Sequence, residues 1–349
     1  MYDDRRTGPW FMVLLAFACG RDKATFTTAG PAPRQTFEDS CAAPPSEWGP
    51  WSPAVPVPGA VNTPANEQHP AISKNRLSLY ISSDRPGGNG NLDIYVSQRK
   101  HREDPWGPPV NLGTNINSSG NDLAPAFSRD GHWLYFHSTG RGGCGGADLF
   151  VSYRNDVHDD FAWEPAKNLD QASLDRDGTC VVNSSSGDAG PTIFEDEETG
   201  ITTLYFTSTR PGGLGDFDVY QSVRARGEEE FGPALPVVEL NGRFRDTRTA
   251  IRRDGLELFL SSDSRERLGG FGSQDIWVST RGATTCSWST PVNLGGNVNT
   301  ADFDGAPALS FDASTLYFYS ARPHADGSVD NDLYVSTRNR IEEGDGSED

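Results

Sequence analysis

Short apolar runs with a two-residue alternation recur along most of the chain, and they predict β-strands. In each of five copies an apolar run ends at a turn and is followed by a second run such as WLYFHS (133–138). A Gly-rich loop then leads to a third run such as ADLFVSYR (147–154), and in four of the copies a fourth run starts at an aromatic residue. No stretch after the N-terminal region has a sustained helical period. Each copy is therefore expected to form four antiparallel strands.

The spacing of the copies predicts how these strands assemble. The copies open at Pro70, Pro125, Pro191, Thr249 and Pro307, which gives intervals of 55, 66, 58 and 58 residues, near the upper end for propeller blades. The fifth copy ends without a fourth run, whereas residues 51–71 align without a gap with residues 106–126. We predict an all-β, closed five-bladed β-propeller over residues 49–340. Its last blade is completed by an N-terminal strand, which removes the open sheet edge.

The repeat also resembles a known family. The pattern PAFSRDGHWLYF (125–136), followed by RGG and DLFVS, resembles the WD-repeat-like propeller repeats of the TolB family of bacterial envelope proteins. The resemblance recurs five times over about residues 51–340 and implies a propeller in the bacterial envelope. TolB itself has six blades and a small α/β domain, which this sequence does not match. The resemblance therefore implies the fold and not TolB's partners.

The N-terminal residues predict export. Arg5 and Arg6 precede a short apolar run, 10–18, which fits a secretory signal and is too short to span a bilayer. AFAC (16–19) resembles the lipobox of bacterial lipoproteins, which implies cleavage before Cys19 and a lipid on that cysteine. A plain secreted protein and a misplaced start remain alternatives. We expect a signal peptide (1–18), a flexible tether (19–48), an acidic tail (341–349), and a monomer held at the outer membrane only through its lipid.

Charge and cysteines narrow the partners. The formal net charge of −19 argues against nucleic acid and against direct docking to anionic lipid, because both demand basic surfaces. An exported chain with four further cysteines is expected to form disulfides, and three pairings are possible. Cys144 and Cys180 both lie in blade 2 and are expected to pair, as are Cys41 and Cys286. Scattered histidines and the absence of a CxxC spacing in the sequence argue against zinc.

A carboxylate stands three residues before every opening residue and is expected to ring one mouth of the channel. These residues are Glu67, Asp122, Asp188, Asp246 and Asp304. Either each caps its own loop, or together they bind a cation or basic ligand. Two positions further on, the symmetry breaks at His69 and Arg248, which are expected to face the same funnel and select a ligand. Alternatively, Arg248 only offsets repulsion among the carboxylates.

Other repeated residues suggest framework. The loops RPGGNGNLD (85–93) and RPGGLGDFD (210–218) approach a calcium repeat out of register, so turns with positive φ are the better explanation. No cofactor is expected, with calcium as the one alternative. Each third strand carries an Asp and, six residues later, an Arg, which we interpret as hydrogen-bonding framework. The positions are Asp93, Asp148, Asp218, Asp275 and Asp332 with Arg99, Arg154, Arg224, Arg281 and Arg338.

Two functions from different classes remain. The leading expectation is a non-enzymatic binding module that holds a protein, peptide or glycan at its channel mouth. The alternative is a glycoside hydrolase similar to the five-bladed arabinanase-like and invertase-like enzymes, with inner-strand carboxylates such as Asp122 and Asp246 as its acid and base. Their near-equivalence argues against it, because an acid and a base need different environments. A peptidase lacks its GxSxG motif, and an envelope scaffold is a further possibility.

Overall fold

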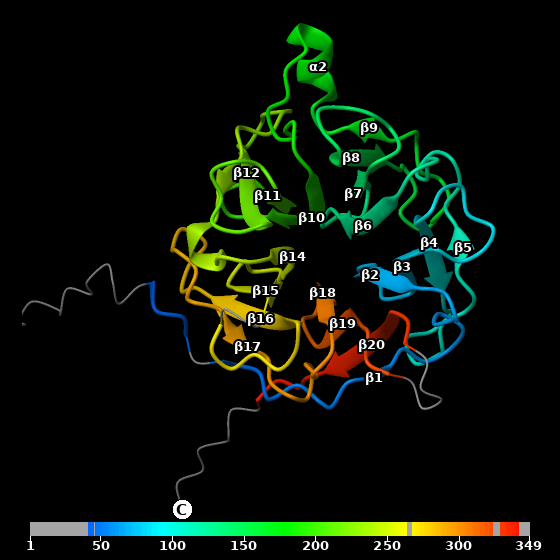
Figure 1. Cartoon of the computed structure of the whole chain (residues 1–349), viewed down its shortest axis with the longest axis vertical. Coiled ribbons are helices and arrows are strands. Elements are labelled where there is room, and N and C mark those ends of the chain that lie inside the picture. The colour runs from blue at the N-terminus through cyan, green and yellow to red at the C-terminus, as the bar shows by residue number, and fades with distance from the viewer. Residues whose placement is uncertain (1–40, 45, 264–266, 324–328, 342–349) are drawn as a thin grey trace, which may run out of the picture. The chain divides into compact units, whose positions relative to one another are not determined.

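Each predicted copy forms one antiparallel sheet, and five sheets surround a central axis (Figure 1). The computed structural model describes residues 41–44, 46–263, 267–323 and 329–341. In blades 1 to 4 the strands run outward from the axis in sequence order, whereas in blade 5 the N-terminal strand β1 takes the outermost place. The strands are rich in aromatic and β-branched residues, which favour sheet structure. This architecture confirms the predicted five-bladed, all-β propeller.

The strands divide evenly among the blades. Their bounds are, for blade 1, β2 (Glu67–Ile72), β3 (Ser78–Ser83), β4 (Asp93–Gln98) and β5 (Val110–Asn111); for blade 2, β6 (Asp122–Phe127), β7 (Trp133–Ser138), β8 (Asp148–Tyr153) and β9 (Lys167–Asn168); for blade 3, β10 (Asp188–Glu195), β11 (Thr202–Ser208), β12 (Asp218–Arg224) and β13 (Leu235–Pro236); for blade 4, β14 (Asp246–Ile251), β15 (Glu257–Asp263), β16 (Gln274–Thr280) and β17 (Val292–Asn293); and for blade 5, β18 (Asp304–Leu309), β19 (Thr315–Ser320), β20 (Asp332–Thr337) and β1 (Val55–Pro56).

The two ends of the repeat array close the ring. β1 pairs with β20 through Val55 opposite Val335, as predicted for an N-terminal strand that completes the last blade. Trp48 is buried and bridges to Arg340, so the ordered propeller begins before residue 49. The expected signal peptide, Cys19 and most of the tether lie outside the described residues, as do residues 342–349 of the expected tail. No helix in the described part of the chain is long and apolar enough to cross a membrane.

Aromatic residues at the fourth strands fill the seams between blades. Trp106 and Trp163 are each 2% exposed and pack in clusters that join neighbouring sheets. The repeated third-strand arginine lies over this aromatic ring, with Arg99 4.1 Å from the centroid of Trp106 and Arg154 4.4 Å from that of Trp163. The predicted framework arginines therefore act partly through cation–π stacking, which gains strength where water is excluded.

The Gly-rich loops fold onto the repeated third-strand aspartate. Asp93 accepts backbone N–H groups from Asn89 and Gly90 of its own loop. Gly87 opens this turn with a φ of 94°, a conformation that a side chain rarely adopts. Loop N–H groups thus occupy the carboxylate that a calcium ion would need.

Two short helical elements of the described residues depart from the all-β pattern and were missed in the sequence. A short helix, α2 (Gln171–Asp177), stands in the insertion of blade 2, and a 3-10 turn, η1 (Val238–Leu240), follows β13. Disulfides join Cys144 to Cys180 beside this insertion and Cys41 to Cys286, the two expected pairs. Seven residues are too few to show a helical period against loop sequence.

Every inner strand contains a β-bulge at the same place. The register slips between Gln68 and Ala71 in β2, and corresponding slips occur in the four other inner strands. The residue in the bulge has a positive φ in every blade, although it is glycine only in blade 3. These residues are His69 (48°), Ala124 (59°), Gly190 (62°), Arg248 (38°) and Ala306 (51°). Bulges re-aim side chains and are common at functional sites.

Candidate functional site

The five carboxylates of the predicted ring are sealed inside their loops. Asp122 and Asp188 have no exposed surface, and the other three are at most 1% exposed. Each accepts a backbone N–H from the residue four positions earlier, at 2.6 Å for Ser184 to Asp188 and 2.8 Å for Thr63 to Glu67. The structure therefore places them in the loop-capping role, which was one of the two predicted alternatives.

An arginine from the same blade neutralises each of these carboxylates. The pairs are Arg85–Glu67 (2.8 Å), Arg141–Asp122 (3.6 Å), Arg210–Asp188 (2.6 Å), Arg267–Asp246 (3.0 Å) and Arg322–Asp304 (2.6 Å). A guanidinium thus stands where a bound cation or basic ligand would have to approach. The same burial removes Asp122 and Asp246 as a hydrolytic acid and base, because substrate cannot reach them.

The bulges connect neighbouring blades by hydrogen bonds. The bulge N–H of Ala124 donates to Ser82 Oγ of the preceding blade at 3.2 Å, and that of Ala306 donates to Ser261 Oγ at 2.8 Å. Gly190 N–H donates to His137 Nδ1 at 3.3 Å. Because Nδ1 accepts a hydrogen bond, we infer that His137 is neutral and carries its proton on Nε2.

His69 lies at the seam between the last blade and the first. Its ring centroid is 5.4 Å from that of Tyr319 and 6.5 Å from that of His137. Burial, with the charge of Arg248, holds the pKa of His69 well below its usual range and lowers the pKa of His137 to about 3. The expected shared face of His69 and Glu67 rested on strand alternation, and the bulge between Gln68 and Ala71 interrupts that alternation.

Arg248 lies on the axis and is only 5% exposed. Its Nη1 donates to the carbonyls of Ala124 (3.2 Å) and Pro191 (2.9 Å), and its Nη2 donates to Pro125 O (2.8 Å). Burial lowers the pKa of this guanidinium to about 9. Arg248 therefore ties three inner strands together, and the expectation that it offsets the ring carboxylates was wrong.

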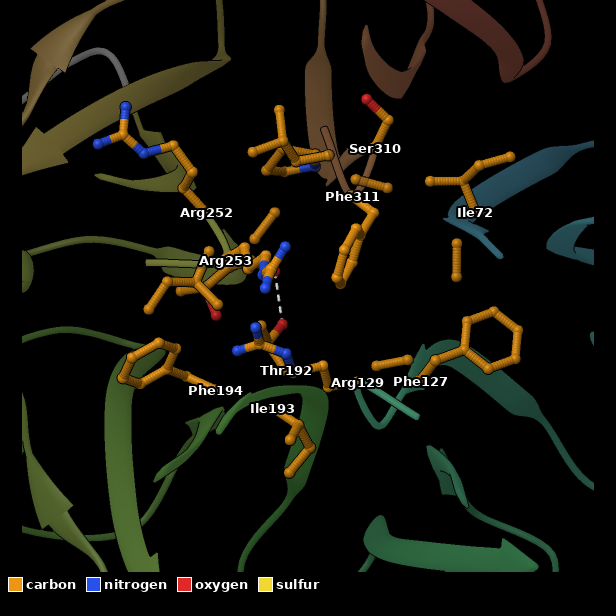
Figure 2. Close-up of a pocket in the computed structure, with 18 of the residues that line it drawn as sticks. Ile72, Phe127, Arg129, Thr192, Ile193, Phe194, Arg252, Arg253, Ser310 and Phe311 are labelled. Atoms are coloured by element: carbon orange, nitrogen blue, oxygen red, sulfur yellow. Dashed lines mark hydrogen bonds between the residues drawn. The ribbon is translucent and has the colours of Figure 1, made fainter. Parts of the chain in front are cut away.

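An open cavity of about 170 Å³ is lined by Arg248 and by the ends of the inner strands, where each blade turns from its first strand into its second. Its rim includes one residue from each hairpin, four positions after the opening Pro or Thr. We call these five residues the hairpin ring: Lys74, Arg129, Glu195, Arg253 and Phe311. Figure 2 shows the Phe311 ring extending over the middle of the cavity.

The hairpin ring joins two carboxylates through one arginine. The backbone N–H of Arg129 donates to Glu195 Oε2 at 2.6 Å, and its Nη2 lies 2.6 Å from Glu197 Oε1. Glu195 is half-buried, whereas the side chain of Glu197 is 65% exposed. A wider groove of about 820 Å³ continues from the cavity along Glu197 and Asp254. The site thus offers carboxylates that a ligand can reach.

Sequence reasoning missed the hairpin ring, although a signal for it exists. The offset of four residues from the opening position is constant, and the residue types there differ in every blade except for the two arginines. Repetition drew attention to the invariant carboxylates instead. An invariant position serves every blade equally, whereas a variable position at a fixed offset marks where the blades differ.

Comparisons with known proteins agree with the fold. No family model and no curated protein matches the sequence. An α-L-arabinofuranosidase from Podospora anserina in complex with cellotriose is similar, with a TM-score of 0.53 and 11% identity over 84% of this chain and 98% of that chain. A GH62 hydrolase in complex with xylotriose has the same TM-score and coverage at 10% identity. An α-L-arabinofuranosidase from Lactobacillus brevis has a TM-score of 0.53 and 14% identity over 80% of this chain and 92% of that chain.

At identities this low, the similarity establishes a shared fold and no more. The three structures named above are glycoside hydrolases, and two of them hold oligosaccharides. This finding contradicts the leading expectation, a non-enzymatic binding module, and favours the alternative of a glycoside hydrolase. The reachable inner-strand carboxylate is Glu195, at the end of β10, and not a member of the predicted ring.

Proposed function

We propose that the chain is a carbohydrate-active enzyme of the glycoside hydrolase type, with the axial cavity as its substrate site. The observation that carries the proposal is the broken symmetry of the hairpin ring, which holds one aromatic residue, one carboxylate and three cations around one cavity. A structural need recurs in every blade, whereas five residues of mixed chemistry at one opening suit a ligand. The fold shared with the hydrolases above supports a sugar as that ligand.

The lining chemistry suits an oligosaccharide. Sugars present C–H groups on one face and hydroxyls at their edges, so a site needs an apolar surface flanked by donors and acceptors. Phe311 supplies the apolar surface, and Arg129 and Glu195 supply a donor and an acceptor beside it. The open groove beyond the cavity gives further sugar residues a path along the face of the propeller.

Hydrolysis also needs two carboxylates in different environments. Glu195 is half-buried and accepts a backbone N–H, while Glu197 is exposed and paired with the guanidinium of Arg129. Both belong to one hairpin, and Arg129 contacts both. We therefore assign Glu195 and Glu197 as the acid–base pair of the proposed reaction.

Release of reducing sugar tests the proposal. The full chain is incubated with arabino-oligosaccharides and xylo-oligosaccharides, the substrates that the related structures suggest. Glu195→Gln is expected to lower kcat/KM by about 100-fold, as loss of a general acid or base does. Glu197→Gln should act in the same direction.

The matched control is Glu228→Gln, an exposed glutamate that lies outside the cavity and groove, and it should keep full activity. Unchanged activity in Glu195→Gln and Glu197→Gln would refute the assigned pair. The absence of both turnover and binding for every oligosaccharide would overturn the proposed function itself.

A further inference from the structure

The axial cavity concentrates positive charge in a strongly acidic protein. The whole chain has a formal net charge of −19, yet five cations line the cavity against one carboxylate, Glu195. The cations are Lys74, Arg129, Arg248, Arg252 and Arg253. A surface of this sign attracts anions from solution while the rest of the protein repels them.

Three of these cations approach one aromatic ring from three different blades. Lys74 Nζ is 4.6 Å from the centroid of Phe311, Arg253 is 4.9 Å away and Arg129 is 5.9 Å away. Figure 2 shows Arg253 and Arg129 near the Phe311 ring. The ring face attracts each cation, and it holds together three charges that repel one another.

These cations are only partly neutralised by the protein. Arg129 and Arg253 share one exposed carboxylate, Glu197, at 2.6 Å and 3.7 Å. Lys74 has no carboxylate partner among the described residues. Arg252, in contrast, pairs with Asp254 at 2.7 Å and with Glu257 at 3.7 Å. Positive charge is therefore left over at Lys74, Arg129 and Arg253.

The buried guanidinium of Arg248, which also lines the cavity, likewise has no carboxylate partner in the described structure. Arg248 donates only to backbone carbonyls, and its Nε has no hydrogen-bond partner in the described structure. A buried guanidinium without a carboxylate is unfavourable, because burial removes its hydration without supplying a counter-charge. An anion in the cavity above would supply one.

We propose that the substrate is an anionic oligosaccharide, with a uronic acid residue bound in the axial cavity over Phe311. Its planar carboxylate would lie among Lys74, Arg129 and Arg253, since guanidinium groups bind carboxylates through paired N–H donors. The apolar face of the same sugar would lie on Phe311. This inference rests on the proposed function and deepens it, because it names the class of glycan.

Calorimetric titration of the full chain tests the inference. The probes are trigalacturonate and a neutral galactose trisaccharide of the same length, each at low and at high salt. Trigalacturonate is expected to bind about tenfold tighter at low salt, an advantage that high salt should remove because salt screens exposed charges.

Matched variants locate the effect. Lys74→Gln and Arg253→Gln should each weaken trigalacturonate by about threefold and leave the neutral trisaccharide unchanged. Lys167→Gln and Arg102→Gln remove exposed cations of the same kinds away from the cavity and should change neither affinity. Equal affinity of the wild type for both sugars would overturn the inference and leave the proposed function standing. Failure of both sugars to bind would count against the two together.

Discussion

The ammonium of Lys74, in the first blade, lies 4.6 Å from the ring centroid of Phe311, in the fifth. Beside this contact, Arg76 Nη1 donates to Asp312 at 2.7 Å and its Nη2 donates to Thr315 at 3.0 Å. Two hydrogen bonds therefore join the same two hairpins in addition to the cation–π contact. The closing seam of the propeller therefore runs through the cavity that we propose as the substrate site. The position of Phe311 depends on ring closure.

Replacement of Phe311 should impair substrate binding more than turnover. In Phe311→Ala the sugar loses its apolar surface, and the three cations around the ring lose the group that holds them together. We expect KM for an oligosaccharide substrate to rise about tenfold with a smaller change in kcat. Phe161→Ala removes a Phe that is 46% exposed and outside the cavity, and it should leave KM unchanged. A KM equal to that of the control would show that Phe311 does not contact substrate.

Replacement of a carboxylate of the predicted ring should impair stability and not activity. Asp188 is fully buried and lies 2.6 Å from Arg210, so Asp188→Asn leaves a guanidinium without its counter-charge. We expect the free energy of unfolding in urea to fall by about 3 kcal/mol. Activity per folded molecule should stay unchanged, because Asp188 does not reach the cavity. Asp216→Asn, at an exposed aspartate, is the control. A loss of activity without a loss of stability would return the carboxylate ring to the substrate site.

Most of the fold could be predicted from the sequence, because the fold is periodic. Blade number, strand order and closure by β1 follow from residues that recur at one offset, such as the openings at Pro70 and Pro125. The role of Asp122 could not be settled in the same way, since a loop cap and a ligand site require the same residue. A matched arginine in every blade, such as Arg141 for Asp122, was the signal that favours a structural role.

The directions of side chains near the axis could not be predicted. His69 and Arg248 adopt positive φ without being glycine, and nothing in their sequence marks the bulge. Alternation therefore does not fix the directions of these two side chains. The tertiary structure imposes this conformation, because the bulge N–H of Arg248 donates to Thr207 of the preceding blade at 3.2 Å. Such contacts exist only once neighbouring blades have packed together.

The two disulfides should differ in what they stabilise. Cys41–Cys286 spans 245 residues and ties the N-terminal segment to blade 4, whereas Cys144–Cys180 spans 36 residues within blade 2. By loop entropy, loss of the long bridge should cost about 5 kcal/mol of unfolding free energy and loss of the short one about 4 kcal/mol. We expect both double variants to lower the global unfolding midpoint, and only Cys144→Ser/Cys180→Ser, not Cys41→Ser/Cys286→Ser, to increase local hydrogen exchange in α2 as well. Equal local protection of α2 in both variants would contradict this division.

The buried histidines should make the propeller sensitive to mild acid. His137 has a folded pKa of about 3, well below its ordinary value of about 6.5, because it is buried and Arg248 is near. Between these values the unfolded chain binds a proton that the folded chain refuses. Stability is therefore complete above about pH 6.5 and is lost as the pH falls. His69 acts in the same direction, because its pKa is also lowered.

Urea titrations at pH 7.5 and pH 5 measure this effect while most carboxylates stay ionised. For His137 alone the linkage relation predicts a loss of about 2 kcal/mol across this interval. His137→Asn should remove that part of the pH dependence, because an amide oxygen can still accept the Gly190 N–H and does not titrate. His101→Asn, at an exposed histidine, should keep the wild-type slope. If His137→Asn and His101→Asn lose the same stability between pH 7.5 and pH 5, then His137 is protonated in the folded state. In that case the hydrogen bond from Gly190 does not hold its imidazole neutral.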